Sequence, residues 1–264
     1  MTNQRVSKKS LSQTTGMKTK DLLDYLAKTM AVAGFKDYCP NGLQIEGKAQ
    51  IQKLAFAVTA SQNAIDMAVS WGANALLVHH GLFWRGDDAC IVGIQKRRIQ
   101  TLLNADMNLL AYHLPLDVHK GWGNNAALGK QLLFKKAGAV SVNGLIWAAT
   151  LTSPLNAKSL AILLSKQLGR EPLLVGNLDR SIRTVAWCTG GAQGYLDQAI
   201  ALGADAYISG EISEQTTHLA RESGVIFAAA GHHATERYGV QALAEHLAGR
   251  FKLECRFFDD DNPA

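Results

Sequence analysis

The feature that most constrains the fold is an internal repeat between residues 51–80 and residues 182–211. The two segments align without a gap, and eight of the thirty aligned positions are identical. In each copy, an apolar segment, a segment of helical periodicity, a Gly-Ala pair and a second apolar segment follow in the same order. Gly72 and Gly203 coincide, which places a helix end at the same point of both copies. The repeat therefore predicts two related β-α-β units that arose by duplication.

Strands and helices are also expected to alternate along the rest of the chain. Segments of strand length lie at 107–112, 146–151, 225–229 and 252–258, and helical periodicity is found at 18–34, 94–103, 124–134, 157–168 and 231–247. The Cys-Pro-Asn-Gly-Leu segment at 39–43 has the composition of a turn-rich loop. This alternation predicts the α/β fold class, with internally duplicated three-layer αβα units and mixed, largely parallel sheets.

Three parts of the chain are expected: a disordered basic tail at 1–16, a first α/β repeat at 17–138 and a second at 139–264. The C-terminal part of the second repeat is also compatible with packing on the first. The chain's 27 basic residues include five within the first 20, where no acid occurs, so 22 remain to balance 22 acidic residues. A basic tail on a neutral body disfavours a nucleic-acid partner.

Composition excludes several classes of protein. No apolar run approaches the roughly 18 residues of a membrane span, so no membrane partner is expected. A hydrophobic content of 47% with 19% charged residues is typical of a globular protein with a sizeable core. The four cysteines are far apart and form no Cys-x-x-Cys motif. Such cysteines are typical of reduced thiols in a cytoplasmic protein.

Two adjacent histidines close the second apolar segment of the first copy. The stretch from Ala75 to Val78 is typical of a buried strand, and His79, His80 and Gly81 follow it. Ligands of open α/β sheets collect beyond the carboxyl ends of strands, and two neutral imidazoles at such a place suggest a metal. The alternative is that one histidine is packed in the core and the other is solvated.

The next strand of each half ends in a histidine followed four positions later by an acid. His113 and Asp117 form this pattern in the first half, and His232 and Glu236 form it in the second. Glu211 lies opposite His80 in the repeat. If the two halves face each other, these strand ends meet at one cleft.

The candidate metal ligands combine imidazoles with carboxylates, a set that suits zinc, iron or manganese. Adjacent side chains on a regular strand point to opposite faces, so two neighbouring histidines serve two ions more easily than one. Two ions at roughly 3.5–4 Å are a common hydrolytic arrangement. The candidates are His79, His80 and Asp117 in the first repeat and His232 and Glu236 in the second, with His113, Glu211, His218 and His233 in reserve.

Other catalytic motifs are absent from the sequence. It contains no G-x-S-x-G elbow, no P-loop and no H-E-x-x-H. The glycine-rich segment 189–194 lies between a strand and a helix and lacks the Rossmann spacing, so a tight turn is favoured over a phosphate seat. Glu211 and Glu214, near a helix start, are more typical of surface residues.

Five motifs in this order resemble those of the YbgI-like dinuclear metal-centre proteins, the type 2 GTP cyclohydrolase I homologues. The motifs are Asn41-Gly42-Leu43-Gln44, Val78-His79-His80-Gly81, His113-Leu114-Pro115-Leu116-Asp117 with Gly123-Asn124-Asn125, Ser209-Gly210-Glu211 and Gly231-His232-His233-Ala234-Thr235-Glu236. The resemblance implies a duplicated α/β fold and a toroidal homohexamer whose metal sites face an internal cavity. It also implies that the family's ligands are His79, His80, Asp117, His232 and Glu236. Two positions depart from the family pattern, because His233 and Gly81 stand where many members have a tyrosine and a proline.

The expected function is that of a dinuclear metal-dependent hydrolase with two divalent ions. The substrate class is a nucleotide or related heterocycle, because the family name implies ring opening of a guanine nucleotide, and links to damaged-nucleotide and DNA-damage metabolism have been proposed. His113 or Glu211 is expected to transfer protons. The alternative is a non-catalytic metal-binding oligomeric scaffold or metal-handling protein.

Overall fold

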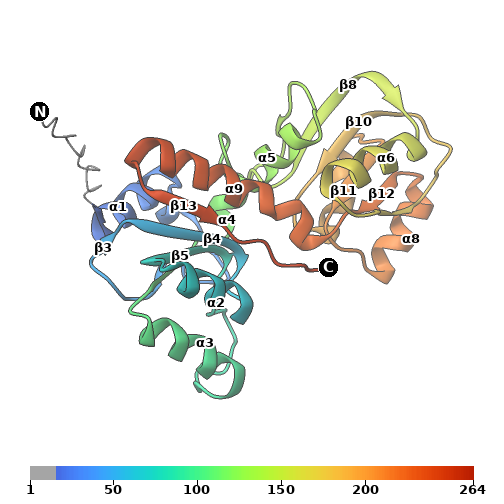
Figure 1. Ribbon diagram of the computed structural model, residues 1–264. Helices are drawn as coiled ribbons and strands as arrows, with labels where there is room; N and C mark the ends of the chain where they lie inside the picture. The colour runs from blue at the N-terminus through green and yellow to red at the C-terminus, as the bar shows by residue number, and fades with distance from the viewer. Residues whose placement is uncertain (1–15) are drawn as a thin grey trace, which may run out of the picture.

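Two β-sheets organise the computed structural model, which describes residues 16–264 (Figure 1). The predicted tail at 1–16 falls almost wholly outside the described residues. In the first sheet the strand order is β13 (Glu254–Phe257), β4 (Lys53–Thr59), β5 (Ala75–His80), β6 (Asn108–Ala111) and β2 (Gly42–Ile45). In the second it is β7 (Gly138–Ala139), β8 (Trp147–Leu155), β10 (Ile182–Trp187), β11 (Ala206–Ser209), β12 (Ile226–Ala229) and β9 (Leu173–Val175). A two-stranded ribbon pairs β1 (Met17–Lys18) with β3 (Gln50–Ile51).

Both sheets are mixed, so the expected α/β class is confirmed. Parallel pairs join β13, β4, β5 and β6 in the first sheet, and β10, β11 and β12 in the second. Antiparallel strands flank these parallel strands, with β2 beside β6, β8 beside β10 and β9 beside β12. In both sheets the parallel strands at the centre are almost entirely buried, as short apolar runs in α/β proteins are.

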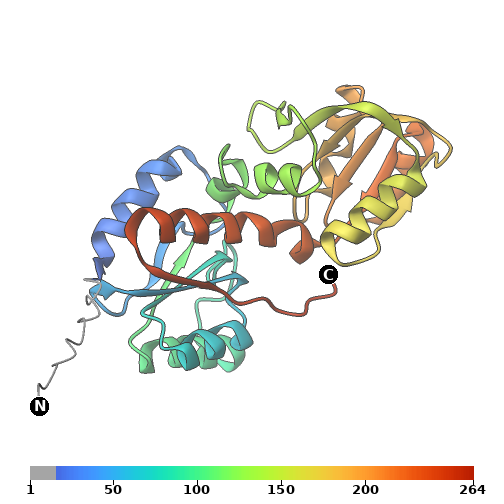
Figure 2. The same cartoon turned by 45° about the horizontal axis from the view of Figure 1, so that its top comes forward.

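Helices cover both faces of the first sheet (Figure 2). Helices α2 (Gln62–Trp71) and α3 (Gly93–Asn104) pack on one face, where Ala55 and Ala57 point. Helices α1 (Thr19–Thr29) and α9 (His232–Phe251) pack on the other, where Leu54 and Phe56 point. The alternation along β4 is the two-residue period of a strand buried on both sides.

The second sheet is also covered on both faces. Helices α5 (Asn124–Gln131) and α6 (Ala157–Leu168) contact the face that carries Val185 and Trp187. Helices α7 (Leu196–Ala201) and α8 (Glu214–Ser223) contact the opposite face. Within residues 16–264, the remaining helical elements are α4 (Leu114–Val118) and the two 3-10 turns, η1 (Val32–Gly34) and η2 (Gln193–Tyr195).

The predicted β-α-β repeat is present down to individual hydrogen bonds. Asn74 Oδ1 accepts the backbone N–H groups of Gln52 and Lys53, each at 2.9 Å. Asp205, at the equivalent position, accepts those of Arg183 and Thr184 through Oδ2, also at 2.9 Å. Gly72 and Gly203 both adopt positive φ, 76° and 73°, where a residue with a Cβ is strained. The two units therefore share their internal geometry as well as their order of elements.

Helix α9 ties the two halves together. Figure 1 shows it in red, running from the second sheet across the first. Val240, Leu243 and Leu247 on this helix are fully buried in the core of the first sheet. Strand β13 then pairs parallel with β4. The last part of the chain therefore packs on the first half, whereas the division near residue 138 stays a prediction.

Two local expectations are corrected. The turn-rich loop at 39–43 runs directly into β2, because Gly42 and Leu43 already pair with Ala111 and Leu110 at the sheet edge. The two H-x-x-x-acid motifs, which look equivalent in the sequence, are offset by one position when the two halves are aligned by their strand registers. His113 is the N-cap residue of α4 and Gly231 that of α9, so His113 is equivalent to Gly231.

Within residues 16–264, no helix has both the length and the apolar composition needed to cross a bilayer.

Candidate metal centre

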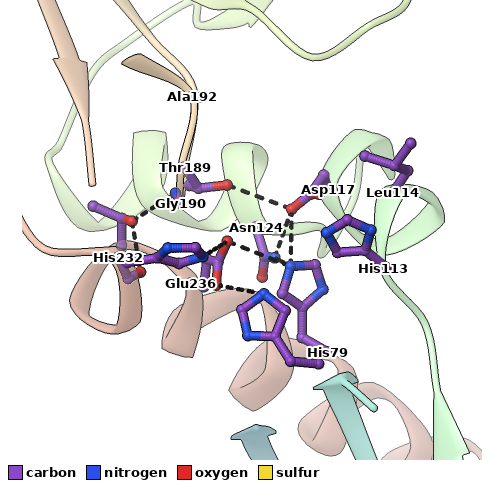
Figure 3. Close-up of polar contacts among 12 residues, drawn as sticks. His79, His113, Leu114, Asp117, Asn124, Thr189, Gly190, Ala192, His232 and Glu236 are labelled. Atoms are coloured by element: carbon purple, nitrogen blue, oxygen red, sulfur yellow. Dashed lines mark hydrogen bonds and ion pairs between the residues drawn. The ribbon is translucent and has the colours of Figure 1, made fainter. Parts of the chain in front are cut away.

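Three segments that are distant in the sequence bring their functional side chains to one point. His79 and His80 end β5, Asp117 lies on α4, and His232 and Glu236 lie in the first two turns of α9. Figure 3 shows His79, Asp117, His232 and Glu236 pointing toward one another. The structure thus brings together all five residues expected from the sequence to hold metal.

The Glu236 carboxylate is at the centre of this group. Its Oε1 lies 3.4 Å from His79 Nε2 and 3.3 Å from His232 Nε2. Its Oε2 lies 3.4 Å from His80 Nε2. Asp117 Oδ1 lies 3.5 Å from the same His79 nitrogen. Three imidazoles therefore converge on one carboxylate, and a second carboxylate stands beside it.

Each of the three imidazoles is held by its other nitrogen. His79 Nδ1 lies 3.0 Å from the Tyr112 carbonyl oxygen, and His80 Nδ1 lies 3.1 Å from Thr59 Oγ1. His232 Nδ1 lies 2.6 Å from Glu211 Oε1. Metal-ligating histidines are oriented in this manner, because a partner on one ring nitrogen leaves the other free to bind the ion. The second nitrogen of each ring is Nε2, and all three Nε2 atoms face Glu236, with Asn124 Nδ2 also 3.4 Å from that of His79.

Both carboxylates are buried, and one oxygen of Glu236 lacks a hydrogen-bond partner within residues 16–264. Asp117 Oδ1 accepts a hydrogen bond from Asn124 Nδ2 at 2.8 Å and a longer one from Thr189 Oγ1 at 3.5 Å. Glu236 is 3% exposed, and its Oε2 has no hydrogen-bond partner among the described residues. An unpaired oxygen of a buried carboxylate is costly in an apolar interior, and a bound cation would satisfy it. The residues therefore fit a metal site.

Two groups of potential ligands share Glu236. One is His79, Asp117 and Glu236, and the other is His80, His232 and Glu236, with ligand atoms in each group within 4.8 Å of one another. A carboxylate common to two ligand groups is suited to bridge two ions. Further groups combine His79, His80 and His113, or Asp37, Cys39 and His113. In the last, both Asp37 oxygens are already hydrogen-bonded, which favours an anchoring role over ligation.

Burial and neighbouring charges shift the pKa values of these clustered residues in different directions. Burial opposes protonation of His79, but Asp117 and Glu236 outweigh it and raise its pKa to about 9. Burial likewise opposes protonation of His232, and its carboxylate neighbours raise the pKa to about 9. For His80, burial dominates and lowers the pKa to about 3. Burial favours neutral Glu236, but the surrounding imidazoles hold its pKa well below the usual range.

The segment Thr189-Gly190 forms a wall of this site, a role that the sequence did not reveal. Gly190 has φ +70°, and a Cβ there would overlap Glu236 Oε1 and lie 3.0 Å from His232 Nε2. Its N–H donates to Thr235 Oγ1 at 3.0 Å. The expected tight turn is present, and because Gly190 has no side chain, the turn can lie close to the first turns of α9.

The remaining predicted residues divide into neighbours of the site and residues outside it. The His113 ring lies 5.0 Å from that of His79, and its Nδ1 lies 2.8 Å from Asp37 Oδ1. Asp37 was not expected from the sequence, which offers no motif around it. His218 is largely exposed and pairs with Glu214 at 3.9 Å. His233 turns away, with Nε2 at 2.8 Å from Asp259 Oδ1.

A cavity of about 270 Å³ opens beside the cluster. Asp117, His232, Glu236 and His113 line it together with apolar and aromatic side chains. A larger cavity of about 630 Å³ lies on the His233 side of α9. Its Arg237 already bonds Asp259 and the Leu168 carbonyl oxygen. Of these two cavities, the smaller one is lined by the candidate metal ligands.

Comparisons with known proteins agree in both sequence and fold. The family model described as Duf34/NIF3 (NGG1p interacting factor 3) matches residues 17–263. A Pseudomonas aeruginosa protein named GTP cyclohydrolase 1 type 2 homolog is 51% identical, over 92% of this chain and 97% of its own. An Allochromatium vinosum protein of the same name is 52% identical, over 93% and 97%. A solved structure titled "Structural genomics, protein ybgI, unknown function" is 45% identical, with a TM-score of 0.90, over 94% of this chain and 100% of its own.

Proposed function

Because the chain belongs to the Duf34/NIF3 family, we propose that it is a dinuclear metal-dependent hydrolase of a nucleotide or related heterocycle. One observation carries the proposal: three imidazoles, each held at Nδ1, direct Nε2 at one buried carboxylate. This donor set suits zinc, iron or manganese. The residues that would hold two divalent ions are His79, His80, Asp117, His232 and Glu236.

Bound ions would supply the chemistry of two-metal hydrolases, which lower the pKa of water and polarise the attacked group. The chain's own residues orient the ligands and move protons. Asp37 holds His113 Nδ1, so Nε2 is the nitrogen of His113 that is free to exchange a proton with a substrate in the cavity. Glu211 holds His232 Nδ1, and we assign it to positioning this ligand rather than to proton transfer.

The adjoining cavity favours a hydrolase over a non-catalytic metal-binding scaffold. Catalytic metal sites keep a position that a substrate or water can reach, whereas structural sites are closed by protein ligands. Here Asp117, His232 and Glu236 all line the cavity of about 270 Å³. A small molecule in this cavity would therefore contact the proposed metal ligands directly.

The relatives' name directs the choice of reaction. Ring opening of a guanine nucleotide by water is the reaction that the name points to, and a role in damaged-nucleotide metabolism belongs to the same proposal. The toroidal homohexamer implied by the family resemblance and the cytoplasmic location predicted from the cysteines are also part of it. Light scattering of the purified protein tests the hexamer, which predicts a mass six times that of the chain.

The decisive experiment is turnover by the metal-reconstituted protein. Protein loaded separately with zinc, manganese and iron(II) is incubated with a panel of nucleotides, nucleosides and cyclic amides, and products are separated by chromatography. We expect metal-dependent hydrolysis that Glu236→Gln abolishes and that Glu245→Gln, an exposed change on the same helix, leaves intact. Full metal occupancy without turnover of any compound would favour the scaffold.

A further inference from the structure

We propose that residues 259–264 form a strap over a second opening of the candidate metal centre, and that this strap controls exchange of the ion held by His80 and His232. The inference rests on the two-ion site of the proposed function, and it adds the part of the chain that governs how one ion enters and leaves. Figures 1 and 2 show this segment, in dark red, running from β13 toward the start of α9. It thus passes beside the first turn of the helix that carries two candidate ligands.

The second opening is a cavity of about 140 Å³ whose lining includes two candidate ligands, His80 and His232. Asn262 and Ala264 of the strap form part of its wall, and so does Thr59, whose Oγ1 lies 3.1 Å from His80 Nδ1. The strap is therefore part of the boundary of a space that reaches the His80–His232 ligand group.

The two cavities at the cluster reach different ligands. Asp117, Glu236 and His232 line the cavity of about 270 Å³, whereas His80 and His232 line the smaller one. A substrate in the larger cavity would cover the Asp117 side of the centre and leave His80 accessible from the smaller cavity. The smaller cavity therefore offers a separate route to the ion of the His80 group.

The size of the smaller cavity suits water and a hydrated ion better than an organic substrate. Its volume of about 140 Å³ holds several water molecules, each of which occupies about 30 Å³ in the liquid. Pockets that bury drug-sized ligands measure roughly 300–1,000 Å³. Polar groups of His232 and Asn262 in the wall are able to bond water. This opening is therefore suited to the exchange of ions and solvent.

One acidic side chain ties the strap to the first half. Asp260 Oδ2 accepts a hydrogen bond from Ser61 Oγ at 2.7 Å, and Oδ1 accepts one from Asn63 Nδ2 at 3.1 Å. Ser61 is the N-cap residue of α2. Just before the strap, the Phe258 N–H donates to the Phe56 carbonyl oxygen at 2.8 Å, and the Phe258 side chain is buried in the core. The start of the strap is therefore fixed to the first sheet and its covering helix.

Further hydrogen bonds tie the strap to the second half and to α9. The Pro263 carbonyl oxygen accepts a hydrogen bond from Arg170, and that of Ala264 accepts the backbone N–H of His233 at 3.1 Å. Asp259 Oδ1 also lies 2.8 Å from His233 Nε2. His233, which departs from the family pattern, therefore bonds the strap through both its backbone and its ring. Together these ties hold the strap across the junction of the two halves.

The ties of the strap are polar and lie near the surface. Every strap residue is exposed except Asp260, which is half-buried. A segment that buries no apolar side chain opens locally at a low free energy while the rest of the fold stays intact. Within residues 16–264, none of the five candidate ligands shares a hydrogen bond with the strap. Breaking one tie should therefore open the smaller cavity and leave the ligands in place.

Zinc exchange by the full-length protein tests the inference without measuring any activity. In stopped flow, a chelating dye takes zinc from the loaded protein, and a weaker zinc–dye complex delivers zinc to the metal-free protein. Asp260→Ala removes the tie to Ser61 and Asn63, and Arg170→Ala removes the tie to Pro263. We expect each variant to speed both release and uptake of one of the two ions by at least about fivefold, because a hydrogen bond that holds the strap closed is lost. Since both rates rise together, the Kd should change by less than about twofold.

Asp261→Ala is the matched control, because it removes the same charge from an exposed strap residue whose side chain makes no hydrogen bond within the described part of the chain. Two results would overturn the inference. One is rates in both strap variants within about twofold of wild type, as exchange through the larger cavity predicts. The other is faster release without faster uptake, as a distorted ligand set predicts. A wild-type protein that retains no zinc would reject the proposed metal site and the strap with it, whereas normal zinc content with strap-independent rates would reject the strap alone.

Discussion

His79 Nε2 lies 3.4 Å from Glu236 Oε1, although His79 ends a strand of the first sheet and Glu236 belongs to a helix that begins in the second half. The contact exists because α9 starts beside the Thr189-Gly190 turn and then buries Val240 and Leu243 in the core of the first sheet. The candidate metal centre is therefore formed at the junction of the two halves. Its assembly depends on their packing as well as on the ligands.

Replacing a central carboxylate should remove the metal without unfolding the protein. We expect Asp117→Ala and Glu236→Ala each to lose most bound metal, because each change removes one of the two buried carboxylates from the proposed ligand set. Metal content by mass spectrometry and circular dichroism measure the two effects. Unchanged metal content in both variants would remove the proposed site, and Glu245→Ala on the same helix is the control.

Glu211 should act on the metal through His232. Its Oε1 lies 2.6 Å from His232 Nδ1, so Glu211→Gln weakens the orientation of this ligand without removing it. Outer partners of metal-binding histidines typically contribute about 10–100-fold to affinity, and we expect a loss in this range. Competition with a chelator measures it. Glu214→Gln, an exposed change nearby, should have no effect, and equal affinities in the two variants would contradict the assignment.

Gly190 should tolerate no side chain. In Gly190→Ala the Cβ would overlap Glu236 Oε1, and the positive φ of +70° adds strain, so metal binding and thermal stability should both fall. Gly194→Ala in the same segment is a matched control, because nothing lies within 4 Å of a Cβ there. A Gly190→Ala protein with normal metal content would show that the turn is not a wall of the site.

Asp205, which occupies the position of Asn74 in the second copy of the repeat, should make the stability of the fold depend on pH. Burial raises the pKa of Asp205, but hydrogen bonds from the Thr184 and Arg183 N–H groups and from Arg180 outweigh burial and lower it. A depressed carboxyl pKa stabilises the folded state above the unfolded pKa, and this contribution is lost as the pH falls through the folded value.

Asp205→Asn introduces the residue that the first copy uses. It should keep the two backbone hydrogen bonds, as Asn74 does, and lose the ion pair with Arg180. For a partly exposed pair, we expect the free energy of unfolding at pH 7 to fall by roughly 0.2–1 kcal/mol. Urea unfolding at pH 7, 5 and 3 should show the difference from wild type shrinking toward acid. A difference that grows on acidification has the wrong sign.

Local pattern was sufficient to predict much of the fold. Helix α6 (Ala157–Leu168) has the predicted bounds, and strand β12 (Ile226–Ala229) begins one residue after the predicted start at 225, because the spacing of apolar residues along the chain reflects the helix and strand periods. The short edge strand β9 (Leu173–Val175) was not predicted, since a strand of this length has no clear period. The two H-x-x-x-acid motifs look equivalent in sequence but differ by one residue in strand register, which only the hydrogen-bonded pairing reveals.

The sequence by itself determined the duplicated α/β units and the histidines at a strand end, and it predicted the residues that we propose as metal ligands. Each of these depends on neighbours along the chain, whose side-chain directions follow from the local backbone. Only the tertiary structure decided that Glu236 is shared by two ligand groups, that Gly190 lies against it and that Asp37 holds His113. Those contacts join residues from different halves or from distant loops, and their distances depend on how the two cores pack around α9.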